Sequence, residues 1–130
     1  MPRLVRIATC SLETDYKTSP RAQALQRVDE AGRRGADIVC LPEFAAADPG
    51  ADGGWIPTAV PGPVVDEFAA LAARHRMWTI VPLIEANPGG KPWNTAVLLD
   101  RSGAIAGRYR KTHLCLPEHG EGETCAAGDA

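Results

Sequence analysis

The sequence predicts an α/β fold in which a layered sheet is covered by helices on at least one face. Three observations support it: apolar runs typical of strands recur along the chain, two stretches have helical spacing behind a proline, and the order reads β-α-β-loop-α-β-β-β. The 130 residues, 45% of them hydrophobic, suffice for one globular domain with a core. No strand or helix follows the last of these elements, so the order does not describe a complete domain.

The first third of the chain predicts a β-α-β unit. Residues 4–9 are apolar and β-branched, which favours a strand. Ser19 and Pro20 are the cap and first residue of a helix, whose apolar residues continue at helical spacing until Gly35 closes it. Residues 37–41 form a second strand, and their continuous apolar run is typical of parallel sheets covered on both faces.

A long loop separates this unit from the remaining elements. Residues 44–61 are rich in Gly, Ala, Asp and Pro and lack periodicity. Pro63 begins a second helix, and residues 77–84 predict a third strand. Residues 95–99 and 104–109 are two strands joined by DRSG, a hairpin-type connection, and the tail is loop-like.

Composition excludes several classes of function. The net charge is −2 and no basic block stands out, which argues against nucleic acid as a partner. No stretch approaches the ~20 apolar residues of a membrane span, and the first residues lack a secretory signal. We therefore expect a cytoplasmic protein with reduced thiols at its four cysteines: Cys10, Cys40, Cys115 and Cys125.

Two charged residues follow apolar strands and are candidates for a site. Glu43 comes after the strand that ends in IVCLP, and Lys111 follows the last strand in GRYRKTHL. Ligands gather outside the carboxyl ends of strands in α/β sheets. A carboxylate base beside an ammonium group suits acyl transfer, which still needs a nucleophile. Taken singly, the glutamate fits a solvated loop and the lysine a solvent-facing basic edge.

The cysteines have simpler interpretations. Cys10 and Cys40 lie in apolar strands and predict small core residues. Cys115 lies between two leucines and predicts a packed side chain. With His119 and Cys125 it could form a small metal-binding module, but the C-x3-H-x5-C spacing lacks a fourth ligand and a C-x2-C pair, so we assign no metal.

Four segments, in order, resemble one family. RIATCSLE, ADIVCLPEF, PGPVVDEFAALAARHRMWTIVPLIE and WNTAVLLDRSGAIAGRYRKTHL are similar to the N-terminal half of the nitrilase superfamily, the carbon–nitrogen hydrolases. ETCAAGD resembles the family's F-x-PGD motif in part: it keeps Gly128 and Asp129 but has Cys125 and Ala127 in place of the aromatic residue and the proline. The resemblance implies an αββα sandwich of which residues 1–130 form about half, as the N-terminal part of one carbon–nitrogen hydrolase domain.

The resemblance also implies residue roles. Glu43 would be the general base of a Glu-Lys-Cys triad, and Lys111 would hold the oxygen of the tetrahedral intermediate. Glu85 and Asn94 look like the family's supporting polar residues near the lysine. Glu121 matches a further glutamate that positions the substrate. Two neighbouring glutamates are alternatives to it if the loop is shifted, namely Glu118 and Glu123.

The chain departs from the family at its end. The family's cysteine comes well after the GD motif, whereas this chain ends one residue after Gly128 and Asp129, and none of its cysteines has a nucleophile-like context. We expect a carbon–nitrogen hydrolase truncated before its nucleophile and inactive alone. The alternatives are a non-catalytic or decayed fragment, or a half-domain completed by a partner chain.

The family further implies an amide, carbamoyl or nitrile substrate of low molecular mass, with an amidase or carbamoyl hydrolase favoured over a nitrilase. It implies no metal or organic cofactor, and a homo-oligomer when the protein is full length. If half the sandwich is absent, the sheet formed by residues 1–110 has an exposed apolar face, and the chain should aggregate or dimerise when expressed alone.

Overall fold

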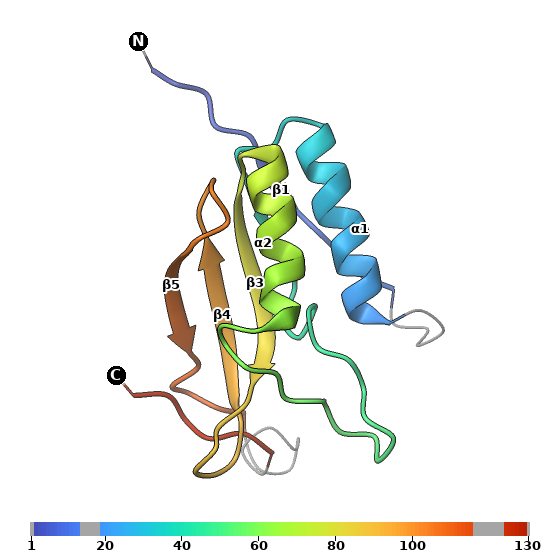
Figure 1. Cartoon of the computed structure of the whole chain (residues 1–130), viewed down its shortest axis with the longest axis vertical. Helices are drawn as coiled ribbons and strands as arrows, with labels where there is room; N and C mark the ends of the chain where they lie inside the picture. The colour runs from blue at the N-terminus through green and yellow to red at the C-terminus, as the bar shows by residue number, and fades with distance from the viewer. Residues whose placement is uncertain (1, 14–18, 116–123, 130) are drawn as a thin grey trace.

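A five-stranded sheet with two helices forms the molecule in the computed structural model, which describes residues 2–13, 19–115 and 124–129 (Figure 1). The elements are β1 (Ile7–Thr9), α1 (Pro20–Arg33), β2 (Ile38–Cys40), α2 (Pro63–His75), β3 (Trp78–Glu85), β4 (Trp93–Leu99) and β5 (Ile105–Arg110). The strands lie in chain order. β1, β2 and β3 are parallel, while β4 and β5 each run antiparallel to the strand before them. The predicted element order is confirmed.

Both helices begin where the sequence predicts. The Ser19 hydroxyl accepts a hydrogen bond from the Ala22 amide at 3.2 Å and caps α1, and Pro20 occupies the first turn. Pro63 does the same in α2, directly after Gly62. Each helix also has an apolar stripe on the side that faces the sheet, which explains why both remain helical in the folded chain.

Three strands differ in length from their predicted ranges. β2 covers Ile38–Cys40, whereas residues 37–41 were predicted. β1 begins at Ile7, not at residue 4, because its ladder with β2 starts at the Ile7–Ile38 pair. Before it, the Arg6 carbonyl accepts hydrogen bonds from the Asp37 and Ile38 amides. β4 begins at Trp93, two residues early, because β3 extends to Glu85 and supplies a partner there. Asn94 therefore lies inside a strand.

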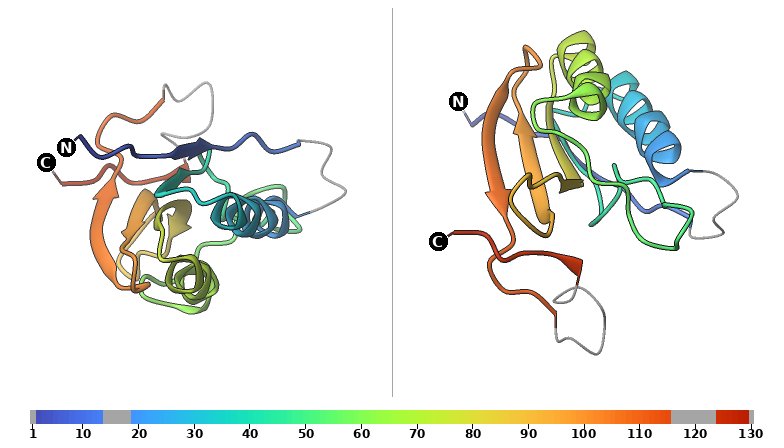
Figure 2. Two further views of the ribbon diagram at one scale, coloured as in Figure 1. Left: turned by 90° about the horizontal axis from the view of Figure 1, so that it is seen from above. Right: turned by 60° about the horizontal axis from the view of Figure 1, so that its bottom comes forward.

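The helices cover one face of the sheet, as both views in Figure 2 show. Side chains of alternate strand residues point to that face and are buried, among them Val39, Val81 and Val97, where they pack against Val28 of α1 and Phe68 of α2. The intervening residues point to the other face and keep part of their solvent contact, namely Cys40, Ile80, Ala96, Leu98 and Tyr109. No element of the described chain covers that face.

The strand directions bring several chain segments to one end of the sheet. The carboxyl ends of β1, β2, β3 and β5 and the start of β4 meet at the lower end of Figure 1. A second, small core lies there, made of Ala47, Ile84 and Cys125 with Phe44 and Leu114 against it. Residues that follow these strands are thereby close in space.

Candidate active site

Glu43, Asn94 and Lys111 meet at this end of the sheet. The Lys111 Nζ atom lies 2.9 Å from Glu43 Oε1, and the Asn94 side-chain amide donates to the same oxygen at 2.7 Å. The glutamate side chain is 53% exposed and the lysine side chain 26%. Residues 68 positions apart in the sequence thus form one charged cluster, as expected of two candidates that each follow a strand.

The backbone around Glu43 is fixed by a turn. Phe44 has a φ of 62°, a left-handed conformation that is uncommon for a bulky residue. It reverses the chain so that the Ala45 amide donates to the Pro42 carbonyl at 3.1 Å. The Ala46 amide donates to the Pro82 carbonyl of β3 at 2.9 Å. The loop after β2 is therefore anchored to β3 at a residue that follows the glutamate in sequence.

The backbone of Lys111 is held on two sides. Its amide donates to the Asn94 carbonyl at 2.8 Å, which extends the β4–β5 ladder by one bond. Its carbonyl accepts from the Gly128 amide at 2.9 Å. The segment after residue 123 thus returns to the site and packs along the end of β5. Asn94 contributes twice, because its side chain binds the glutamate while its carbonyl fixes the lysine.

Glu85 lies on the helix-covered face of the sheet. Asn94 of the Glu43 cluster lies on the opposite face, because it pairs with Ile84, the residue before Glu85. Its carboxylate accepts hydrogen bonds from Thr95 at 2.8 Å, from Arg108 at 2.9 Å and from Arg110 at 2.7 and 3.0 Å. The Arg110 guanidinium also lies 3.5 Å over the Trp93 ring. The structure thus links Glu85 to the residue before Lys111.

Glu85 remains charged although its side chain is buried. Its side chain is only 3% exposed, and burial by itself would raise the pKa of this carboxyl. The hydrogen bonds from Arg110 and Thr95, with the positive charges of both arginines, nevertheless hold its pKa below the ordinary value. Glu85 is therefore ionised at neutral pH and fixes Arg110.

A hollow of about 480 Å³ opens beside the Glu43 cluster on the uncovered face of the sheet. Besides the three cluster residues, its lining includes Cys40, Tyr109 and His113. These last three were not among the predicted site residues. The signal for Tyr109 is its alternation with Arg110 on β5, which puts it on the same face as Lys111.

The arrangement suits proton transfer. Both hydrogen bonds to Glu43 end on Oε1, and among the described residues none ends on Oε2. One oxygen is thus held by an ammonium and an amide, which fixes the carboxylate, while the other can accept a proton from a reacting group. An ammonium at hydrogen-bonding distance from the base can also stabilise a developing oxyanion.

The remaining predicted site residues have other positions. Glu118, Glu121 and Glu123 lie outside the described residues, as does His119. Cys10 and Cys40 are half-buried and Cys125 is buried, whereas Cys115 is exposed, so the expected packing of Cys115 is wrong. The leucines beside it did not predict burial, because residue 115 follows the last strand and leaves the sheet. Over the described ranges, no three His, Cys, Asp or Glu side chains cluster as metal ligands do, and no helix could cross a bilayer.

Comparison with known sequences identifies the relatives of this chain. Residues 6–129 match the family model described as carbon-nitrogen hydrolase. A formamidase from Allorhizobium ampelinum is 36% identical over 87 residues, which cover 64% of this chain and 25% of the relative. A formamidase from Bacillus cereus is 31% identical over 93 residues, or 68% and 28% of the two chains. The chain thus spans about a quarter of the length of these curated relatives.

Solved structures share the fold. A double mutant of the amidase from Nesterenkonia sp. AN1, in complex with acrylamide, superimposes with a TM-score of 0.73 at 19% identity, covering 100% of this chain and 51% of the amidase. The C. elegans NitFhit protein gives 0.71 at 22% identity, covering 97% of this chain and 34% of that one. At such identities the likeness concerns the fold. Since the family model extends over nearly all 130 residues, the chain belongs to the carbon–nitrogen hydrolases.

Proposed function

We propose that the protein hydrolyses an amide bond in a small non-peptide substrate, with Glu43 as general base and Lys111 as oxyanion support. The observation that carries the proposal is the convergence of Lys111 Nζ and the Asn94 amide on one oxygen of Glu43, at 2.9 and 2.7 Å. An ion pair this exposed contributes only about 0.2–1 kcal/mol to folding. Fold stability alone therefore gives little reason for three residues from separate parts of the chain to meet here.

In the proposed reaction, a cysteine supplied from outside these 130 residues attacks the amide carbon. Glu43 takes the thiol proton, and the ammonium of Lys111 holds the oxygen that gains the electron pair of the carbonyl. Glu43 then returns the proton to the leaving ammonia or amine, and a thioester remains. Water, deprotonated by Glu43, attacks the thioester, which releases the acid and restores the thiol.

The supporting residues have proposed roles as well. Asn94 orients Glu43 through its amide, and Glu85 fixes Arg110 and so the backbone that carries Lys111. Glu121 is the proposed substrate-positioning glutamate. The formamidase and amidase relatives favour an amide substrate over a carbamoyl compound or a nitrile. We further propose that the complete protein is a cytoplasmic homo-oligomer that needs no cofactor.

The test is ammonia release from formamide and acetamide by the complete protein as its source cells make it. Glu43→Gln should lower kcat/KM about 10²–10⁴-fold, and Lys111→Met about 10²–10³-fold. Glu67→Gln and Lys91→Met are matched controls, because both side chains are exposed and neither lines the hollow beside Glu43. A Glu43→Gln protein that keeps activity within about tenfold of the wild type would contradict the general-base role.

The intact mass of the native protein decides where the cysteine resides. An active protein heavier than 13.8 kDa places the cysteine in the same chain. An active protein of 13.8 kDa requires a second chain that completes the site, for which the uncovered face of the sheet offers room. Alkylation of the active protein should then modify a cysteine outside residues 1–130. A native chain of 13.8 kDa without activity would instead support the non-catalytic alternative.

A further inference from the structure

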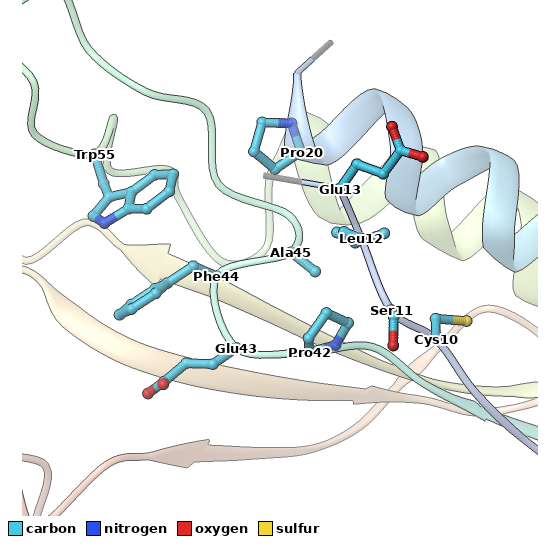
Figure 3. Close-up of a pocket in the computed structure, with 10 residues that line it drawn as sticks. All are labelled: Cys10, Ser11, Leu12, Glu13, Pro20, Pro42, Glu43, Phe44, Ala45 and Trp55. Atoms are coloured by element: carbon cyan, nitrogen blue, oxygen red, sulfur yellow. The ribbon is translucent and has the colours of Figure 1, made fainter. Parts of the chain in front are cut away.

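A second cavity, of about 420 Å³, adjoins Glu43 (Figure 3). Two loops form its walls, residues 10–13 after β1 and residues 42–45 after β2, and Pro20 and Trp55 complete it. Lys111 and Asn94 do not line it. Glu43 is therefore shared between this cavity and the hollow that contains the lysine, and a molecule whose reacting group lies at Glu43 can extend into the cavity.

The lining is mostly apolar. Six of its residues present carbon to the cavity: Leu12, Pro20, Pro42, Phe44, Ala45 and Trp55. The volume lies within the range of cavities that bind small molecules, which combine apolar walls with a few polar groups. Its two acidic residues, Glu13 and Glu43, disfavour an anionic occupant.

The cavity wall is preformed. Phe44 keeps its left-handed backbone, and its ring stacks on Trp55 with centroids 5.4 Å apart and planes inclined by 22°. The same loop is tied to α1, because Asp48 accepts a hydrogen bond from the Ser19 hydroxyl and pairs with Arg21 at 2.8 Å. Strain at Phe44 is thus offset by contacts that also position the aromatic wall.

We infer that this cavity binds the uncharged, apolar acyl substituent of the amide substrate, with Phe44 and Trp55 as its aromatic wall. The inference rests on the proposed function and narrows its substrate class to amides of aliphatic or aromatic carboxylic acids. The amide group lies beside the Glu43–Lys111 pair, and the substituent leaves water as it enters the cavity. Selectivity among amides then follows the apolar area buried by the substituent.

The test compares kcat/KM of the complete protein for formamide, acetamide, propionamide and butyramide. Each added methylene should raise kcat/KM about threefold to fourfold. Trp55→Ala opens the wall and should reduce the ratio of butyramide to formamide at least about fivefold. Ser11→Phe places a ring in the cavity from an exposed position and should reduce the same ratio without disturbing the core.

Ile56→Ala is the matched control for Trp55→Ala. It removes a large apolar side chain from the same loop, at a position that does not line the cavity, and should leave the ratio unchanged. The inference fails if amides are hydrolysed and both cavity variants keep the wild-type ratio, which leaves the proposed function intact. If no amide is hydrolysed by the wild-type protein, that result contradicts both the proposed function and this inference.

Discussion

Glu85 keeps a negative charge in a place where almost no water reaches it, and the charge is stabilised by Thr95 of β4 and by two arginines of β5. Glu85→Gln retains the shape of the side chain but leaves Arg108 and Arg110 without their carboxylate. We expect a loss of about 2 kcal/mol of unfolding free energy, below the 3–5 typical of broken buried pairs, because both arginines keep some solvent contact. Urea denaturation at pH 7 measures it, and a variant as stable as the wild type would contradict this role.

The same substitution has a predicted pH dependence. The folded state lowers the pKa of Glu85, so its contribution to stability is complete above the pKa of the unfolded chain, near 4.5, and is lost as the pH falls through the lower folded value. The difference in unfolding free energy between wild type and Glu85→Gln should therefore narrow below about pH 4.5. Glu67→Gln, at an exposed position, should show a small difference at every pH. If the difference in unfolding free energy stays constant as the pH is lowered, Glu85 is not charged in the folded protein.

Residues 124–129 form a short segment that is hydrogen-bonded to the backbone beside the site. A Cβ on Gly128 would lie 2.5 Å from both the carbonyl oxygen and the Cβ of Arg110, so Gly128→Ala must displace the segment. The hydrogen bond from residue 128 to the Lys111 carbonyl should be lost, and hydrogen exchange of that amide should accelerate at least about tenfold. Gly89→Ala is the control, since its Cβ would contact only a side-chain oxygen at 3.7 Å. Equal exchange in wild type and Gly128→Ala would show that the segment is not held there.

Element positions were predictable where local chemistry decides them. Ser19, Pro20 and Pro63 mark helix starts through capping and fixed φ angles, which depend on a few neighbouring residues. Strand ends depend on partners. Residues 4–6 have strand-like composition yet lie outside the ladder, which begins at the Ile7–Ile38 pair. No local feature of the sequence around Trp93 predicts that this residue pairs with Glu85.

The site was predictable in part for the same reason. Family motifs marked Glu43, Asn94 and Lys111, and the strand directions bring them together. The motifs also marked Glu85, but only the strand phase places it on the opposite face of the sheet, where it binds Arg110. The left-handed turn at Phe44 and its contact with Trp55 had no sequence signal, because both depend on how the loop folds back over β3.

On the scale of the molecule, the uncovered face of the sheet presents apolar side chains that no element of the described fold covers. Ile7 and Tyr109 are 69% and 59% exposed on or beside it, and Leu98 and Ile80 lie at its centre. The 130-residue chain alone should therefore self-associate, and sedimentation equilibrium should detect this as a mass that rises with concentration. Leu98→Lys should weaken the association, whereas Ile56→Lys, in the loop before α2, should not.

In the complete protein, Leu98→Lys should be destabilising. If further chain covers this face, as the length of the relatives suggests, Leu98→Lys buries an unpaired ammonium and should lower the unfolding free energy by more than about 2 kcal/mol. In the 130-residue chain the same lysine reaches water and should cost less than about 0.5 kcal/mol. The two effects together separate a face covered within the protein from one that stays open. A complete protein that tolerates Leu98→Lys would show that this face stays open to solvent.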